Sequence, residues 1–120
     1  MKFIIYNGSL KADAESNTFS VCKMTQLAFE KLGHECEVVT LRDLNYEGST
    51  SDVNDELKPH IMKMFKADGV IFATPIWWGN HSCHIQAMLE RLDVIYSWAK
   101  DNKYQPFYNK FFVTLVSGGV

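Results

Sequence analysis

The chain lacks the features that mark several classes of protein. Its three cysteines, Cys22, Cys36 and Cys83, are an odd number, and their spacing matches no metal framework. Its 12 lysines and arginines stand against 14 aspartates and glutamates, so the net charge of −2 provides no basic surface for nucleic acid. No apolar run approaches the roughly 20 residues that cross a bilayer. We therefore expect neither a nucleic-acid partner nor a membrane partner.

The first residues of the chain predict no secretion signal. Residues 1–5 are mostly apolar, but the polar sequence Asn7-Gly8-Ser9 interrupts the run before it can form a signal-peptide core. Without such a signal, the odd number of cysteines predicts a reducing compartment, and we expect a cytoplasmic protein. The chain has no internal repeat and no low-complexity tract. Its 120 residues, of which 47% are apolar, suffice for one globular domain with a buried core.

Short apolar runs alternate with helix-period patterns along the chain. The runs predict strands over residues 2–6, 36–41, 70–74 and 111–116. The periodic patterns predict helices over residues 17–32, 54–66 and from residue 82 to about residue 96. Residues 44–54 and 100–110 are polar and predict connecting loops. Strands that alternate with helices form βαβ units, so we expect an α/β fold with a parallel sheet.

The stretch between the first predicted strand and the first predicted helix is rich in groups that bind anions. Ser9, Ser16 and Thr18 supply hydroxyls, Asn17 supplies an amide and Lys11 supplies a positive charge. The first N–H groups of a helix have no intrahelical acceptor, and the helix dipole adds positive potential there. The stretch therefore predicts a phosphate site. The alternative is that Ser16, Asn17 or Thr18 only caps the helix.

Two further loops are expected at the same edge of the sheet. Residues 75–80 (Pro-Ile-Trp-Trp-Gly-Asn) follow the third predicted strand, and residues 117–119 (Ser-Gly-Gly) follow the fourth. The carboxyl ends of parallel strands share one edge, and ligands of open α/β sheets bind outside it. Three loops rich in glycine, serine, asparagine and tryptophan at one edge favour a ligand site over simple turns.

Together these motifs resemble the flavodoxin-fold family of NAD(P)H-dependent FMN reductases and quinone reductases. Gly8–Lys11 with Ser16–Thr18 resembles the family's phosphate-binding loop. Thr74–Asn80 resembles the loop that lies along the isoalloxazine ring and the ribityl chain, and Gln86–Leu92 resembles the helix that follows it. Ser117–Gly119 resembles the loop that approaches the pyrimidine side of the flavin. The resemblance covers essentially the whole chain.

The resemblance carries expectations about fold and function. It implies a doubly wound, flavodoxin-like parallel sheet in the order 2-1-3-4 within a single domain over residues 1–120, with the family's fifth strand missing. It implies hydride transfer from NAD(P)H through FMN to a quinone, a flavin or a similar small acceptor, with no side chain as nucleophile, and a homodimer or homotetramer. The residues that it assigns to the cofactor are Ser9, Lys11, Ser16, Asn17, Thr18, Pro75, Ile76, Trp77, Trp78, Gly79, Asn80, Ser117, Gly118 and Gly119.

The chain departs from the family pattern in its first loop and at its end. Lys11 stands where arginine is common, which keeps the charge but loses bidentate geometry. The carboxylates of Asp13 and Glu15 would repel a phosphate unless they point to solvent. The family's fold continues beyond Val120, and the apolar strand over residues 111–116 would be left at an edge. We therefore expect a longer natural product or a second subunit that covers this strand.

The sequence also supports predictions about metal sites, surface charges and alternative functions. Residues 44–54 contain no cysteine, which argues against the iron–sulfur branch of the family. The sequence His81-Ser82-Cys83-His84 suggests a metal site, but four adjacent residues cannot all converge on one ion, so we expect no metal. Glu90, Arg91 and Asp93 are open to two interpretations, a pair on a helix surface or an interface contact, and we expect their charges to be solvated. Two alternative functions stay open, an electron-transfer flavoprotein without nicotinamide activity and a truncated interaction domain without flavin.

Overall fold

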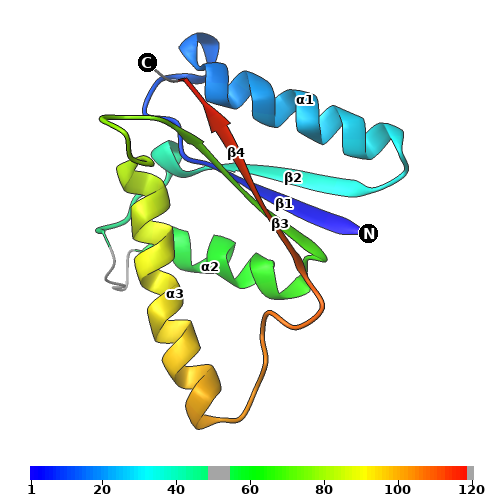
Figure 1. Ribbon diagram of the computed structural model, residues 1–120, viewed down its shortest axis with the longest axis vertical. Coiled ribbons are helices and arrows are strands. Elements are labelled where there is room, and N and C mark those ends of the chain that lie inside the picture. Colours follow the sequence, from blue (N-terminus) through cyan, green and yellow to red (C-terminus); the bar gives the residue numbers. More distant parts are fainter. Residues whose placement is uncertain (49–54, 119–120) are drawn as a thin grey trace.

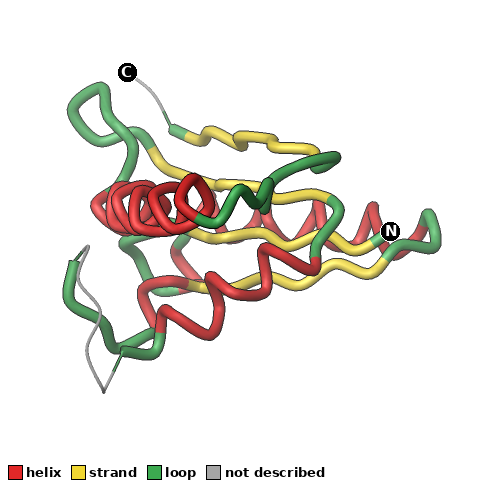
Figure 2. The backbone as a smooth tube through the Cα atoms, turned by 90° about the horizontal axis from the view of Figure 1, so that it is seen from below, coloured by secondary structure: helices red, strands yellow, loops and turns green. Residues whose placement is uncertain are grey.

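The computed structural model describes residues 1–48 and 55–118. Its sheet contains four parallel strands, β1 (Lys2–Asn7), β2 (Glu35–Thr40), β3 (Gly69–Pro75) and β4 (Phe111–Ser117). Their order across the sheet is β2-β1-β3-β4, and the strands lie side by side in Figure 2. The predicted α/β class, the parallel sheet and the strand order 2-1-3-4 are confirmed.

Helices cover both faces of this sheet. Figure 1 shows α1 (Asn17–Lys31) on one side, with α2 (Leu57–Met62) and α3 (Cys83–Asp101) on the other. Three short 3₁₀ turns complete the elements, η1 (Asp13–Glu15), η2 (Leu41–Asp43) and η3 (Lys63–Lys66). The predicted doubly wound arrangement is therefore present, with the central strands β1 and β3 enclosed between two helical layers.

The helix bounds follow the local chemistry. α1 begins at its predicted residue because the side chain of Ser16 accepts a hydrogen bond from the backbone N–H of Phe19. It ends before Gly33, whose φ of +87° is the left-handed conformation that glycine adopts freely. The second predicted helix, over residues 54–66, is wrong in extent. It forms as the shorter α2 followed by η3, with Pro59 in the first turn of α2, where no N–H is needed.

The core lies on both faces of β1 and β3, whose successive side chains point to opposite faces. On the α2 and α3 side, Ile4 and Tyr6 of β1 pack with Val70 and Phe72 of β3. The residues that cover this face include Leu57, Ile61, Met64, Ile85 and Met88. On the α1 side, Ile5 and the β3 residues Ile71 and Ala73 pack against Cys22 and Phe29. This two-sided core fixes the strand ends from which the loops depart.

β4 forms one edge of the sheet, and its side chains are not enclosed. Its apolar sequence predicts cover on both faces, whereas Phe111, Phe112, Val113 and Val116 are all exposed among the residues that the structure describes.

Among the helices of the described residues, none is both long enough and apolar enough to cross a membrane.

Candidate functional site

The loops after β1, β3 and β4 enclose a cleft of about 210 Å³ at the carboxyl edge of the sheet. The first loop and the start of α1 contribute Ser9, Leu10, Lys11, Glu15, Ser16, Asn17 and Thr18. The second and third loops contribute Pro75, Ile76, Trp77, Ser117 and Gly118. The structure thus brings together the three loops that the sequence places at one edge. They meet at the N-terminus of α1.

Three of the assigned residues that the structure describes do not line this cleft. Trp78, Gly79 and Asn80 form a turn beyond its wall, and the side chain of Trp78 is 99% exposed. Gly119 lies outside the described residues. The cleft also includes Leu10 and Glu15, which are not among the residues predicted to bind the cofactor. Both residues lie inside the predicted phosphate loop, and only Glu15 carries a charge that signals an interaction with an anion.

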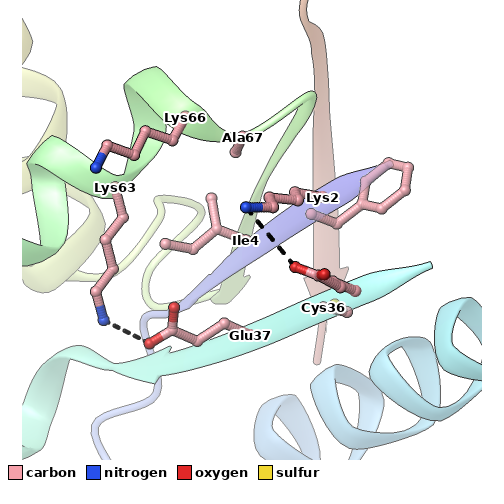
Figure 3. A pocket seen from close by; sticks show the side chains of 9 residues that line it. Lys2, Ile4, Cys36, Glu37, Lys63, Lys66 and Ala67 are labelled. Carbon is pink, nitrogen blue, oxygen red and sulfur yellow. Dashed lines mark hydrogen bonds and ion pairs between the residues drawn. The ribbon is translucent and has the colours of Figure 1, made fainter.

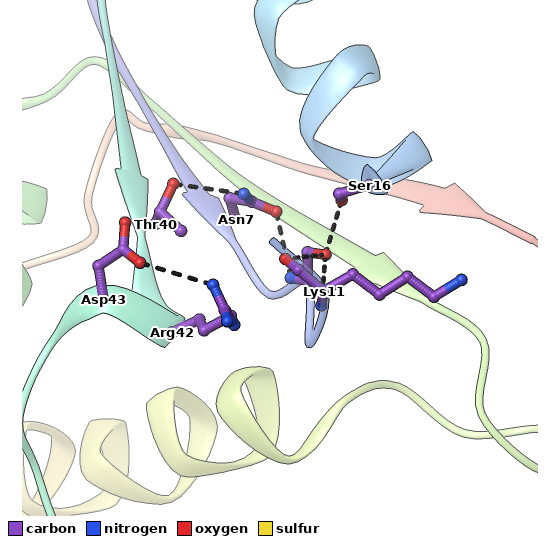
Figure 4. Close-up of polar contacts among 7 residues, drawn as sticks. Asn7, Lys11, Ser16, Thr40, Arg42 and Asp43 are labelled. Carbon is purple, nitrogen blue, oxygen red and sulfur yellow. Dashed lines mark hydrogen bonds and ion pairs between the residues drawn. The ribbon is translucent and has the colours of Figure 1, made fainter. Parts of the chain in front are cut away.

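The first loop, which follows β1, is held in place by hydrogen bonds. The amide of Asn7 bridges two strand ends, since its Oδ1 accepts from the backbone N–H of Ser9 (3.1 Å) and its Nδ2 donates to Thr40 Oγ1 (3.3 Å) (Figure 4). The Ser16 hydroxyl donates to Ser9 Oγ (2.6 Å) and also caps α1. Ser16 is therefore both a helix cap and a cleft residue, so the two readings of the sequence are compatible. The side chain of Lys11 extends away from Ser16 in Figure 4.

Further hydrogen bonds tie the three loops to one another. Thr18 Oγ1 lies 2.6 Å from Ser117 Oγ, which joins the start of α1 to the end of β4. The backbone N–H of Ile76 donates to the carbonyl of Ser117 (3.1 Å), which joins the second loop to the third. The backbone N–H of Ser82 donates to Thr74 Oγ1 (2.9 Å), which fixes both ends of the second loop. The cleft walls are therefore positioned by a continuous set of contacts.

Gly8 permits the closest approach in this region. A Cβ atom at this position would lie 2.5 Å from Cγ1 of Ile85 and 2.8 Å from Oγ of Ser82. The first loop therefore rests directly on the N-terminal turn of α3. Any larger residue at position 8 must displace either the loop or the helix.

A buried ion pair lies behind the second loop, on α3. Arg91 Nη1 and Nη2 donate to the two carboxylate oxygens of Asp55 at 2.6 and 2.7 Å, and Arg91 Nε donates to the carbonyl of Gly48 (3.2 Å). The two side chains are 5% and 2% exposed, so the expectation that Arg91 is solvated is wrong. The bidentate bonds from Arg91 hold the pKa of Asp55 below its ordinary value. The pair fastens the segment after β2 to α3.

An aromatic pair extends the same contact toward the N-terminus of α3. The hydroxyl of Tyr46 contacts Nδ1 of His84, and the Tyr46 ring centroid lies 5.7 Å from Cζ of Arg91. Burial raises the pKa of Tyr46 to about 12. Burial and the nearby charge of Arg42 lower the pKa of His84. His81 contacts Gln86 instead, and among the described residues no group of three or more His, Cys, Asp or Glu side chains is placed to hold a metal ion.

A larger depression, of about 320 Å³, opens at the opposite edge of the sheet. Figure 3 shows its two ion pairs, Lys63 to Glu37 (2.5 Å) and Lys2 to Glu35 (3.9 Å). It lies at the amino ends of β1 and β2, whereas ligands of open α/β sheets bind at the carboxyl ends. The smaller cleft has the loops, the hydroxyls and the helix N-terminus, so we take it as the functional site.

A sequence model of the family described as NADPH-dependent FMN reductase matches residues 1–120, the entire chain. The chain belongs to the NADPH-dependent FMN reductase family. The family is one of FMN-dependent oxidoreductases. The predicted family resemblance is confirmed.

Individual relatives match this member of the FMN reductase family at low identity. An iron–sulfur flavoprotein of Archaeoglobus fulgidus is 26% identical over 130 residues, which cover all of this chain and 60% of the relative. A structure of RosB with a bound 8-demethyl-8-formylriboflavin-5′-phosphate intermediate matches with a TM-score of 0.79 at 26% identity. It covers 97% of this chain and 51% of RosB. The chain therefore spans 60% of the length of the first relative and 51% of the second.

An azoreductase from Bacillus anthracis, solved in complex with FMN, matches with a TM-score of 0.72 over all of this chain and 70% of its own. Its 13% identity shows a shared fold alone.

Proposed function

We propose that the cleft binds FMN and that the chain serves an NAD(P)H-dependent reductase whose electrons pass to a quinone, a flavin or a similar small acceptor. The observation that carries the proposal is the meeting of three loops at the N-terminus of α1, in a chain matched throughout by an FMN reductase family model. The riboflavin-phosphate intermediate bound by RosB supports a flavin that carries a phosphate.

The donor set of the cleft fits one phosphate group. Ser9, Ser16 and Thr18 are almost fully buried, and their hydroxyls face one another or Ser117 across short distances. The first backbone amides of α1, at Asn17 and Thr18, have no intrahelical acceptor and carry the positive end of the helix dipole. These groups would hold the phosphate, because a hydroxyl proton can rotate from its present partner to an anionic oxygen.

The remaining cleft residues suit the flavin ring. Pro75, Ile76 and Trp77 form an apolar wall, and Trp77 is 44% exposed. Gly118 at the third loop leaves the backbone accessible on the other side. When bound, FMN supplies the hydride chemistry, and the protein supplies binding, orientation and the local field. No side chain of the cleft is needed as a nucleophile.

Titration of the purified chain with FMN, followed by flavin fluorescence and the visible spectrum, tests this proposal. Riboflavin is the matched control, because it has the same ring without the phosphate. A charge-assisted hydrogen bond contributes about 1.5–3 kcal/mol, so we expect FMN to bind at least about 100-fold more tightly than riboflavin. Equal affinities would refute the phosphate site, and no binding of either flavin would favour the interaction domain without flavin.

Use of the nicotinamide needs a separate experiment. Stopped-flow reduction of the FMN-loaded protein by NADH and by NADPH should show bleaching of the flavin band by at least one of them. A protein that binds FMN tightly but is not reduced by either nucleotide would instead be an electron-transfer flavoprotein.

A further inference from the structure

The second loop of the cleft ends in a tight two-residue turn. The backbone N–H of Trp77 donates to the carbonyl of Asn80, and the N–H of Asn80 donates to the carbonyl of Trp77, both at 2.9 Å. The two residues between them, Trp78 and Gly79, have φ values of +50° and +76°. Two consecutive positive φ values within such a bridge are the pattern of a type I′ turn.

Trp78 is an unfavourable residue for its place in this turn. The first central position of a type I′ turn prefers asparagine, aspartate or glycine, and a bulky side chain at positive φ is strained. The strain is not offset by burial, because the indole is 99% exposed. A strained conformation of this kind persists where the surrounding structure imposes it, and it is concentrated at sites that bind ligands.

The turn is rigidly attached to the cleft. Trp77, the residue before Trp78, lines the cleft, and Ile76 is hydrogen-bonded to Ser117 of the opposite wall. Thr74 and Ser82 fix the two ends of the loop. The two tryptophans therefore have different surroundings: Trp77 belongs to the cleft wall, and Trp78 projects an uncovered aromatic face from the tip of the same loop.

We propose that Trp78 determines specificity by stacking on an uncharged, planar aromatic electron acceptor of the quinone class. This inference rests on the proposed function. Residues 75–80 contain no charged side chain, so the tip offers no partner for the phosphates of a dinucleotide. A flat indole instead favours a neutral ring, since aromatic pairs gain from offset stacking. The strained turn holds this surface beside the cleft.

The test uses three variants. Trp78→Asn removes the ring and installs the residue that the turn prefers, so the fold is retained. Trp78→Tyr keeps an aromatic face at the same position. Trp98→Gln is the matched control, because Trp98 is also exposed (56%) but lies in the last turns of α3 and lines no part of the cleft.

The first readout is equilibrium binding of menadione to the oxidised, FMN-loaded protein, followed by the flavin absorbance without any nicotinamide. We expect Trp78→Asn to weaken menadione binding by about tenfold, while Trp78→Tyr and Trp98→Gln stay within about threefold of the wild type. The Kd for FMN should be the same in all four proteins. In turnover, Trp78→Asn should raise KM for menadione and leave kcat and KM for the nicotinamide unchanged.

Each contrary result has a distinct meaning. Unchanged menadione binding in Trp78→Asn, with FMN still bound, would overturn the stacking role and leave the proposed function intact. A shift of Trp78→Asn to a smaller species in sedimentation velocity, without a change in menadione binding, would assign Trp78 to an interface and also overturn it. If the wild type binds no FMN, the proposed function fails, and this inference fails with it.

Discussion

At the scale of single residues, the environment of Arg91 differs most from what its neighbours in the sequence indicate. It follows Glu90 and lies close to Asp93 on a helix, yet its partner is Asp55, which comes from the segment before α2. No local pattern encodes a contact between residues this far apart. By contrast, the cap at Ser16 could be predicted, because a cap and the helix it starts are adjacent in the sequence.

Because the Arg91–Asp55 pair is buried, we expect substitution of Arg91 to lower the stability of the fold. Arg91→Met keeps much of the aliphatic volume but leaves the carboxylate of Asp55 buried without its bidentate partner, and breaking such a pair costs about 3–5 kcal/mol. Urea unfolding should therefore show a large loss of unfolding free energy. Lys63→Gln is the control, because its pair with Glu37 is half exposed and should contribute less than about 1 kcal/mol. Equal losses in the two variants would show that the buried Arg91–Asp55 pair stabilises the fold no more than an exposed pair does.

Glu15 is the residue whose charge opposes the proposed ligand. It lines the cleft, whereas Asp13 in the same 3₁₀ turn does not. Glu15→Gln should tighten FMN binding several-fold by removing a repulsion, and the gain should shrink as salt is added. Asp13→Asn carries the same charge change outside the cleft and should have little effect. If both substitutions act equally, only the overall charge matters.

Two histidines make stability depend on pH. Burial lowers the pKa values of His60 and His84 below the ordinary value of 6.5, aided by the charges of Lys63 and Arg42 respectively. Between the lowered value and 6.5 the unfolded chain therefore binds more protons than the folded one, so stability is complete above about pH 6.5 and declines on acidification. Chemical denaturation at several pH values should show this slope. His84→Gln should flatten it, and substitution of the exposed His81 should not.

At the scale of secondary structure elements, the cleft depends on the approach of the first loop to α3. Gly8→Ala would place a methyl carbon against Ile85 and Ser82, which are parts of the buried first turn of that helix. We expect lower thermal stability and at least a tenfold weaker affinity for FMN, because a shift of α3 also moves Thr74 and the second loop. Gly33→Asn is the control, since Gly33 has open space around it and asparagine tolerates positive φ. Wild-type FMN affinity in Gly8→Ala would contradict this coupling.

Elements with a strong pattern could be predicted, and elements fixed by distant contacts could not. The four strands followed from apolar runs, and the meeting of their loops followed from the rule that parallel strands share a carboxyl edge. The predicted extent of the helix over residues 54–66 was wrong because apolar spacing does not distinguish one long α-helix from a short α-helix followed by a 3₁₀ turn. The different roles of Trp77 and Trp78 also escaped prediction, because they depend on a turn conformation that adjacent aromatic residues do not signal.

At the scale of the whole molecule, the edge strand β4 has an open backbone edge and exposed apolar side chains. β4 pairs with β3 on one side, and no strand among the described residues pairs with its other side. Its side chains at Phe111, Phe112, Val113 and Val116 are exposed. An open backbone edge that carries apolar side chains favours pairing with another chain. This arrangement supports the proposal that the protein is a homo-oligomer.

Self-association of this chain is therefore expected, and it should depend on the edge rather than on apolar surface in general. Sedimentation velocity across a range of concentrations should show reversible growth of the wild type beyond the monomer. Val113→Lys should shift the distribution back toward the monomer, because a charged side chain on an edge strand opposes pairing. Met24→Lys makes the same kind of change at a residue of α1 that is 70% exposed, and it should leave association unchanged. A wild type that stays monomeric throughout, or equal effects of the two lysines, would show that β4 does not mediate assembly.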